Sequence, residues 1–543
     1  MITAPTGLGK TTFVLNTLLP YTVWRKGEFP GEADTRMLIL CNRRLLRQQY
    51  WFSLIQRFDR YREMEDNVEV KTYQQIAEEI KQNNDILKMF RRYSIIVCDE
   101  IHYFYADADF NGFGTYAVLQ AIMLAGFTHT MVFMSATTKE VAPLLEKTLE
   151  RACHIGRVQG ILPPERCGEW VPYDFSHLAD YTHFSFLSIA DTFSLCKALA
   201  GSKGKSLVFI DDKGKAQGMR NEMEKAGIPK QDMVMLNADN LDSEELSPVI
   251  NKMVMTHRLE KKVTFTTSVL DNGVSIEDPD VQNVVIITES PISFLQMLGR
   301  VRAGHADQIN VYLLRRPPEF FEKRVRQYQR AMNAINEVTK DDINRYRFPL
   351  LDVLINQGNS EQAEILRKFL VLCPNDLAYL DYGNAKARTS CRDTRLVVNN
   401  FAREKLGDML IVESRLQILA MEDPQKVIEE QVSWLGIDSS EVIVLSSTYK
   451  EAIRKEFVEE VCKIRKFSKA QMVETKEMLS KKFRKDLFPD VVKKTCSFSD
   501  EKFKEILARY GLVLLTEDTK EGVRYTVLRE KGEEKDADRK GSC

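Results

Sequence analysis

Near the amino end lies Ala4-Pro5-Thr6-Gly7-Leu8-Gly9-Lys10-Thr11-Thr12, a glycine-rich loop that opens into the apolar helix start Phe13-Val14-Leu15. Gly7 and Gly9 let backbone amides turn inward with no Cβ in the way, Lys10 can reach the outer phosphates of a nucleotide, and the Thr11 hydroxyl can ligate Mg²⁺. A plain glycine turn before a helix is the alternative, since Ala4 stands where the strict pattern has glycine. We predict a phosphate-binding loop made of Thr6, Gly7, Gly9, Lys10, Thr11 and Thr12.

A buried β-run, Ile95 to Cys98, ends in the acids Asp99 and Glu100. Neighbouring side chains on a strand point to opposite faces, so this pair needs a bend at the strand end to reach one metal site. There Asp99 would hold Mg²⁺ through water, and Glu100 would orient or deprotonate the attacking water. A solvated strand end is the alternative for an isolated Asp-Glu pair. The phosphate-binding loop lies one α/β half-domain upstream, and this spacing favours a shared site.

Another buried run, Met131 to Met134, ends in small hydroxyl residues. With it the chain resembles superfamily 2 nucleic-acid helicases, with APTGLGKT as motif I, CNRRLL as a loose motif Ia, DEIH as motif II and SAT as motif III. DEIH departs from the commoner DEAH only at Ile101, which carries no reacting atoms. The resemblance implies an α/β fold of two tandem RecA-like domains with parallel sheets, and ATP with Mg²⁺ between them. It also implies that the nucleotide is coupled to movement through His102, Ser135 and Thr137.

The resemblance continues in the second half-domain. Residues 263–274 resemble motif V, and residues 294–302 resemble motif VI, Q-x-x-G-R with a further arginine. By resemblance Gly273 would contact the nucleotide, Thr267 would contact nucleic acid, and the catalytic residues would be Gln296, Arg300 and Arg302. An arginine supplied across a cleft can be worth roughly 10³ to 10⁵ in rate. Many members place the second arginine three residues after the first and here it is two, so which arginine reaches the γ-phosphate stays open. A surface ion pair is the alternative for either one.

Only Met1, Ile2 and Thr3 precede the phosphate-binding loop, although such a loop normally leaves the end of a buried parallel strand. Either the reading frame begins inside the domain, or the chain is a fragment whose first sheet lacks an inner strand and leaves two neighbouring edges unpaired. We expect truncation just before motif I. An authentic start at Met1 is the alternative.

Candidates for nucleic-acid contact follow the predicted strands and recur near the carboxyl end. Asn42, Arg43 and Arg44 follow the apolar run 36–41, at the sheet edge where ligands gather, and Thr72 ends a second short run. Lys481 and Lys482 lie in a basic segment, 463–494, that could contact a duplex. A solvated helix face is the alternative for both basic groups.

The composition is ordinary for a globular protein, with 543 residues, 44% of them hydrophobic and 29% charged, and a net charge of −1. The chain has no global basic field, so any nucleic-acid surface must be local. Ten cysteines form no CxxC pair, and no run approaches the ~18 apolar residues of a membrane span. We therefore expect reduced thiols, no structural metal, no membrane association and a cytoplasmic location.

The expected domains are a RecA-like domain at 1–155 without its N-terminal strand, a second RecA-like domain at 170–320, a mostly helical accessory region at 325–495, a helix-hairpin module at 496–530 and a disordered tail at 531–543. The expected function is that of an ATP-dependent helicase or translocase, an enzyme that favours DNA over RNA. Two alternatives stay open. One is the motor subunit of a restriction or replication complex with protein partners, and the other is an ATP-gated nucleic-acid-binding module without unwinding. The sequence does not set the oligomeric state.

Overall fold

The computed structural model describes residues 1–28, 36–58, 61–82, 89–126, 129–158, 170–210, 212–237, 239–240, 243–244, 246–267, 270, 274–302, 308–337, 361–374, 394–445, 457, 460–461, 466–467, 471–479, 501, 503–504, 507, 512–518 and 524–530. The chain divides into two compact units, 1–444 and 445–543. The first unit contains two parallel α/β sheets, which confirms the predicted fold class.

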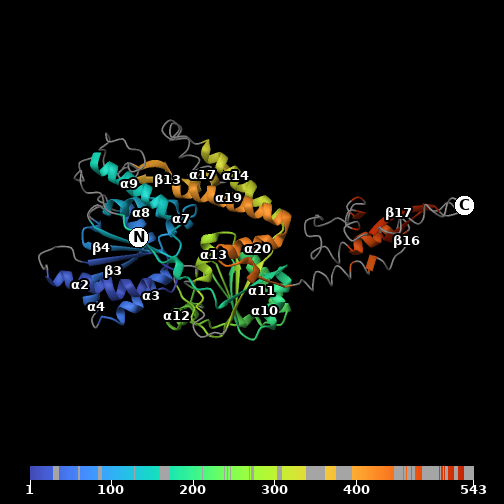
Figure 1. Cartoon of the computed structure of the whole chain (residues 1–543), viewed down its shortest axis with the longest axis horizontal. Coiled ribbons are helices and arrows are strands. Elements are labelled where there is room, and N and C mark those ends of the chain that lie inside the picture. The colour runs from blue at the N-terminus through green and yellow to red at the C-terminus, as the bar shows by residue number, and fades with distance from the viewer. Residues whose placement is uncertain are drawn as a thin grey trace. The chain divides into compact units, whose positions relative to one another are not determined.

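The first sheet has the strand order β3-β2-β4-β5-β1-β6, and all of its pairings are parallel. Figure 1 shows its strands β3 and β4 in blue at the left. Its strands are β1 Ile2–Thr3, β2 Arg36–Cys41, β3 Val68–Thr72, β4 Tyr93–Asp99, β5 Thr130–Ser135 and β6 Tyr173–Asp174. The inner strands are buried on both faces, as the continuous apolar runs in β2 and β4 require of a parallel sheet. We call this sheet and its helices the first lobe.

Strand β1 is short, but it is paired on both sides. Its two residues align with Met134 and Ser135 of β5 and with Tyr173 and Asp174 of β6. The prediction of two unpaired neighbouring edges is therefore wrong at these positions, because a two-residue strand fills the place between β5 and β6. Since β6 lies beyond residue 155, the chain returns to the first sheet before it enters the second.

Helices of the first lobe connect its strands and cover the sheet. They are α1 Lys10–Phe13, α2 Leu19–Glu28, α3 Arg44–Ile55, α4 Tyr61–Asn67, α5 Tyr73–Gln82, α7 Tyr103–Ala106, α8 Gly112–Ala125 and α9 Ala142–Val158, with a π-helical turn Val14–Leu18 between α1 and α2. Helix α8 is apolar on nearly all sides and is almost wholly buried. Such a helix needs cover on the face turned away from the sheet, and residues from beyond position 360 provide it.

The second sheet has the order β15-β7-β12-β11-β8-β10-β9 and is also parallel. Its strands are β7 Phe184–Ile189, β8 Lys205–Ile210, β9 Met233–Leu236, β10 Val263–Thr266, β11 Val281–Ile287, β12 Ile309–Leu314 and β15 Ile443–Val444. Its helices are α10 Thr192–Gly201, α11 Lys213–Lys225, α12 Ser247–Thr256 and α13 Pro291–Leu298. We call this sheet and these helices the second lobe.

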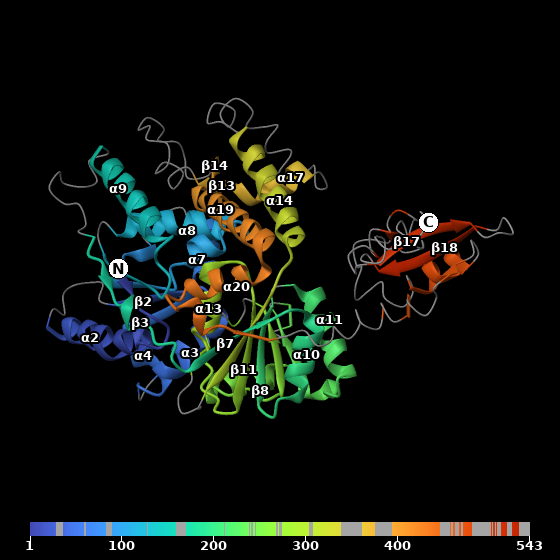
Figure 2. The same cartoon turned by 45° about the vertical axis from the view of Figure 1, so that its right-hand side comes forward.

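The region after β12 packs against both lobes. It comprises α14 Pro318–Asn336, α17 Glu361–Phe369, β13 Leu370–Pro374, β14 Thr394–Val398, α19 Asn400–Glu422 and α20 Pro424–Ser433. Val371, Cys373 and Val397 of the antiparallel pair β13–β14 share the core of the first lobe, whereas Ile428 and Val432 of α20 share the core of the second. Helices α14 and α19 lie side by side in both views (Figure 2). The region is thus a clamp that holds both lobes.

The second unit contains an antiparallel sheet with the order β16-β18-β17, made of β16 Lys466–Phe467, β17 Leu512–Asp518 and β18 Arg524–Glu530. The pairing of β17 with β18 matches the hairpin predicted there. Lys481, Lys482 and the tail 531–543 lie outside the described residues. Across the ranges described above, no helix has the length and apolar character needed to span a membrane.

Candidate active site

The phosphate-binding loop has the backbone shape that its glycines allow. Gly7 and Gly9 have φ angles of 96° and 87°, in the left-handed region, and Gly9 directly precedes α1. The Lys10 amine folds back over the loop and donates to the carbonyl oxygens of Ala4 at 2.8 Å and Pro5 at 3.3 Å. The loop is therefore a closed turn with its lysine above it. This is the geometry in which backbone amides and one cation converge on an anion.

The two acids after β4 reach the same site because the backbone bends at Glu100. This residue has a φ of 53°, a left-handed conformation that costs a non-glycine residue roughly 1–2 kcal/mol. The Glu100 amide donates to Asp99 Oδ1 at 2.9 Å, and the Tyr50 hydroxyl donates to Asp99 Oδ2 at 2.7 Å. Tyr73 donates to the Asp99 carbonyl at 2.8 Å. These bonds hold the bend that the sequence pattern requires.

Burial and neighbouring charges separate the pKa values of the two acids. Burial raises the pKa of Asp99 to about 6, and the adjacent Glu100 carboxylate adds to that rise. Burial also raises the pKa of Glu100, but the Arg300 guanidinium, His102 and Lys10 outweigh it and hold this pKa below its usual range. The pKa of Lys10 is lowered by burial, and Arg300 and Arg302 lower it further, against the opposing effect of both acids. Glu100 is therefore ionised at neutral pH.

The second lobe contributes Arg300 to this cluster. Its Nη2 donates to Glu100 Oε1 at 2.7 Å and to Gln296 Oε1 at 3.0 Å, and Gln296 Nε2 donates to Thr137 Oγ1 at 2.8 Å. Glu100 and Thr137 lie in the first lobe. Gln296 on α13 and Arg300 just after it therefore form hydrogen bonds across the boundary between the lobes. All four of these side chains are buried.

Arg302 also faces the loop, and the reason is backbone pairing at Val301. Val301 forms a parallel bridge with Ile276, whose amide and carbonyl bond to residues 300 and 302. In such an extended segment alternate side chains point the same way, so a spacing of two turns both arginines to the cavity. Arg302 donates to Ser275 Oγ at 2.7 Å, and its guanidinium carbon would lie only 3.2 Å from a Cβ placed on Gly7. Glycine at position 7 thus permits this close approach.

These residues line one cavity of about 260 Å³, to which both lobes contribute. From the predicted set it is lined by Thr6, Gly7, Gly9, Lys10, Thr11, Thr12, Asp99, Glu100, Arg300 and Arg302. The residues fit a triphosphate with Mg²⁺. The glycine turn, Lys10 and two arginines match the negative charge, while the Thr11 hydroxyl and the Asp99 carboxylate are oxygen ligands of the kind Mg²⁺ takes alongside phosphate oxygens.

Comparison with known proteins gives a family-model match and similar solved structures. Residues 1–140 match the family model described as "Type III restriction enzyme, res subunit". The matched residues include the stretches that resemble motifs I, II and III of superfamily 2 helicases. Among solved structures it is similar to S. cerevisiae Dbp5 bound to RNA and ADP BeF3, with 17% identity and a TM-score of 0.39 over 58% of this chain and 79% of that one.

Other structures similar to this helicase-like chain cover a similar share of it. Mycobacterium smegmatis helicase Lhr bound to ssDNA and AMP-PNP has 16% identity and a TM-score of 0.39 over 57% of this chain and 43% of that one. Mss116p bound to ssRNA and AMP-PNP has 15% identity and a TM-score of 0.42 over 60% and 67%. No curated protein matches the chain.

Side-chain contacts next to the cavity join motif II to motif III. His102 Nδ1 lies 3.0 Å from Ser135 Oγ and 3.4 Å from Glu100 Oε2. The Thr137 amide donates to Ser135 Oγ at 3.1 Å. The predicted coupling residues therefore form one buried network, which reaches motif VI through Gln296.

The candidates for nucleic-acid contact do not gather in this cavity. Arg43 makes two bonds to the Asp107 carboxylate, at 2.8 and 3.3 Å, and Arg44 is exposed at the start of α3. Asn42, Thr72 and Thr267 are buried at the carboxyl ends of β2, β3 and β10. Their role in binding nucleic acid stays a prediction. Gly273 lies outside the described residues.

Several residues that complete the site carried no recognisable sequence signal. Tyr50 and Tyr73 hold Asp99 by hydrogen bonds from elements far along the chain. Ser275 and Glu277, just past motif V, contact Arg302. In the sequence, Tyr50 is one of three consecutive aromatic residues that follow several arginines, and the other three residues are indistinguishable from ordinary polar positions.

A further unpredicted contact joins the accessory clamp to the segment after motif II. Asn399, which caps α19, also donates from Nδ2 to the Ala108 carbonyl at 3.1 Å. Lys405 bonds to the Ala106 carbonyl and to Asp109, and Tyr105 donates to Asp408. Helix α19 therefore holds the segment that directly follows Asp99 and Glu100.

Proposed function

We propose that this helicase-like protein is a nucleic-acid-dependent ATPase that hydrolyses ATP between its two lobes and thereby moves on or unwinds DNA. The observation that carries the proposal is the contact of Arg300 with Glu100, which brings a cation of the second lobe to the acid of the first at 2.7 Å. Hydrolysis completed across a lobe boundary would depend on lobe closure.

Each residue of the cavity has a role that its chemistry supports. Thr6, Gly7, Gly9, Lys10 and Thr12 would hold the phosphates through the loop turn and the amine. Thr11 and Asp99 would hold Mg²⁺, which, when bound, neutralises phosphate charge. The ionised Glu100 can accept a proton from water or orient it. Arg300, with Arg302 beside it, lies where charge on the transferring group would be stabilised.

The hydrogen bonds between the lobes support coupling to movement. Gln296 joins motif VI to Thr137 of motif III, and Thr137 bonds to Ser135, which contacts His102 next to the acids. A change at the phosphates would thus alter contacts on which the relative position of the lobes depends. We propose that this relative motion ratchets a nucleic-acid strand, and that the protein acts in the cytoplasm.

An ATPase assay with single-stranded DNA, duplex DNA and RNA added separately tests this proposal. We expect hydrolysis stimulated most by DNA and abolished in Glu100→Gln, and a strand-displacement or translocation signal that is lost with it. Arg326→Gln is a control, because its ion pair with Glu322 is exposed on α14. Displacement or translocation that continued in a Glu100→Gln protein without ATPase activity would overturn the motor mechanism. ATP-dependent binding of nucleic acid without movement would instead indicate a gated binding module.

A second candidate is the motor subunit of a larger assembly, which the match of residues 1–140 to a restriction-enzyme subunit favours. In that case the chain alone would hydrolyse ATP on DNA but would produce no strand displacement or translocation. The same match supports DNA over RNA as the substrate. Strand displacement by the purified chain would contradict this second candidate.

A further inference from the structure

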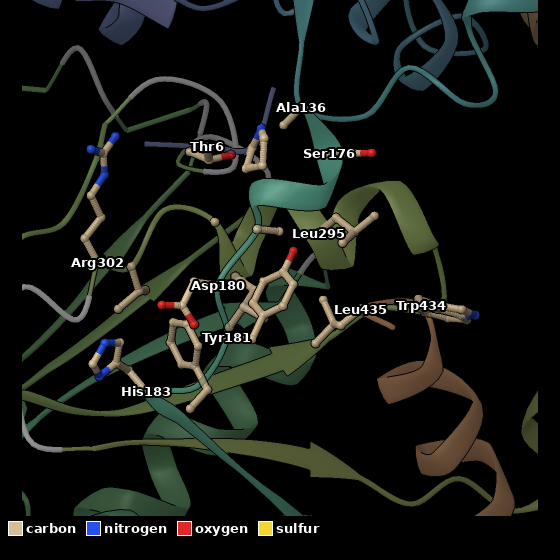
Figure 3. Close-up of a pocket in the computed structure, with 16 residues that line it drawn as sticks. Thr6, Ala136, Ser176, Asp180, Tyr181, His183, Leu295, Arg302, Trp434 and Leu435 are labelled. Carbon is tan, nitrogen blue, oxygen red and sulfur yellow. The ribbon is translucent and has the colours of Figure 1, made fainter. Parts of the chain in front are cut away.

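The cavity between the lobes has a second part. A space of about 340 Å³ shares Thr6 and Arg302 with the phosphate cavity, and Figure 3 shows the Tyr181 ring projecting into it. This space continues the site already described. The described residues that line neither part include Arg43, which follows β2, and Asp107, which follows α7. These two side chains form an ion pair outside the nucleotide site.

The ion pair of Arg43 and Asp107 is bidentate and only partly buried. Two guanidinium nitrogens of Arg43 donate to the two carboxylate oxygens, at 2.8 and 3.3 Å, and the side chains are 22% and 16% exposed. A phosphate presents its oxygens to the same fork of donors, so carboxylate and phosphate compete for one guanidinium. Arg43 also directly precedes α3, and the amino end of a helix favours an anion.

Helix α19 fixes the backbone on both sides of Asp107. Lys405 donates to the carbonyl oxygen of Ala106, and Asn399 Nδ2 donates to that of Ala108 at 3.1 Å. The position of the Asp107 carboxylate is therefore set by contacts of its neighbours and does not depend on the ion pair. A carboxylate held in place in this way is a standing competitor for any anion that approaches Arg43.

The segment that carries Asp107 also packs against a residue that holds Asp99. Tyr103, at the start of α7, stacks on Tyr73 with ring centroids 5.0 Å apart and ring planes 8° apart. The Tyr73 hydroxyl donates to the Asp99 carbonyl at 2.8 Å. Direct contacts therefore connect Arg43, through Asp107 and α7, to the backbone of Asp99.

We propose that Asp107 competes with a nucleic-acid phosphate for Arg43, and that replacement of the carboxylate by the phosphate is the step through which a bound strand acts on the segment after Asp99. The inference rests on the proposed function and adds a residue that holds back both strand binding and ATP hydrolysis. When a phosphate takes Arg43, the Asp107 carboxylate loses its partner, and α7 loses the contact that ties it to the residue after β2.

Fluorescence anisotropy of a labelled oligothymidylate strand, titrated with the full chain at several salt concentrations, tests the competition. Asp107→Asn keeps the side-chain shape and removes the charge, so it should bind the strand roughly 5- to 30-fold more tightly, the factor that such a charged pair is worth. Arg43→Gln should bind more weakly and lower the slope of log affinity against log salt by about 0.7, for one lost phosphate contact. Asp107→Asn should have no effect on affinity in the Arg43→Gln background. Equal tightening in both backgrounds would indicate a general charge effect and would overturn the proposal.

ATP hydrolysis without nucleic acid tests the link to Asp99. Asp107→Asn should raise this basal rate by up to the same factor and should need less DNA for half-maximal stimulation, a gain that misfolding cannot produce. Glu322→Gln is the control, because Glu322 pairs with Arg326 on the exposed face of α14, and it should change neither quantity. An unchanged basal rate in Asp107→Asn would overturn the link, and an unchanged strand affinity would overturn the competition. In both cases DNA-stimulated hydrolysis by the wild type would leave the proposed function standing, whereas a wild type that DNA does not stimulate would overturn both proposals.

Discussion

Replacing Arg300 with glutamine should weaken the contact between the lobes and remove most ATP hydrolysis. Arg300 Nη2 lies 2.7 Å from Glu100 Oε1, and the two side chains are 5% and 4% exposed. At an effective dielectric constant of 20, this separation gives a gross attraction of about 6 kcal/mol, which desolvation of both ions offsets in large part. Removing one partner leaves the other charge buried alone. We therefore expect Arg300→Gln to lower the free energy of unfolding by about 3–5 kcal/mol.

A double-mutant cycle isolates the interaction free energy between Arg300 and Glu100. The variant Glu100→Gln/Arg300→Gln leaves two neutral amides in place of the ion pair, so it should recover more than half of the loss seen in Arg300→Gln. Urea unfolding followed by circular dichroism gives the four free energies. Arg326→Gln, which breaks the exposed pair with Glu322 on α14, should change stability by less than about 0.5 kcal/mol.

The same variants test the catalytic role. Arg300→Gln should lower DNA-stimulated ATP hydrolysis by about 10³-fold or more, as loss of an arginine finger does in related phosphoryl transfers, whereas Arg326→Gln should leave it unchanged. The reasoning is refuted if Arg300→Gln, shown to be folded at the assay temperature, hydrolyses ATP within tenfold of the wild-type rate.

Three other predictions concern buried hydrogen bonds and charges. Tyr50→Phe removes the donor to Asp99 Oδ2, so the pKa of Asp99 should rise above about 6. The acid limb of the ATPase pH profile should then move to higher pH, and an acid limb that stays in place would contradict this prediction. Asn399→Ala removes the cap of α19 and its bond to Ala108, so the free energy of unfolding should fall by about 2 kcal/mol. The control is Asn251→Ala at an exposed position of α12, which should leave the free energy of unfolding unchanged. Glu413 is buried on α19 and accepts a hydrogen bond from Arg324 of α14 at 2.7 Å. Burial raises its pKa from 4.5 to about 7 against the opposing effect of Arg324, so the stability that Glu413 contributes is present below pH 4.5 and is lost as the pH rises through 7. Relative to Glu413→Gln the wild type should lose about 3 kcal/mol between pH 4.5 and 8, and a constant difference in thermal stability across that range would contradict this.

Local patterns in the sequence predicted the strands and the phosphate-binding loop of the lobes. The apolar runs Ile95 to Cys98 and Met131 to Met134 form strands because consecutive apolar residues suit a strand that is buried on both faces, and parallel strands align such ends at one edge. The glycine spacing in the phosphate-binding loop likewise specifies a local backbone shape, with φ angles of 96° and 87° at Gly7 and Gly9. These features depend on neighbours within a few positions, which is why they could be predicted.

Contacts between distant segments needed the tertiary structure. The sequence left open which arginine faces the phosphates, and the bridge between Val301 and Ile276 turns both of them to the cavity. Tyr50 supports Asp99, and α19 holds the segment after motif II through Asn399, although neither pairing has a signal in the order of residues. Side chains separated by tens to hundreds of positions meet only when the sheets and the clamp have packed. The sequence by itself therefore determined the loops and strands of the site, and the packing of the lobes decided which side chains complete it.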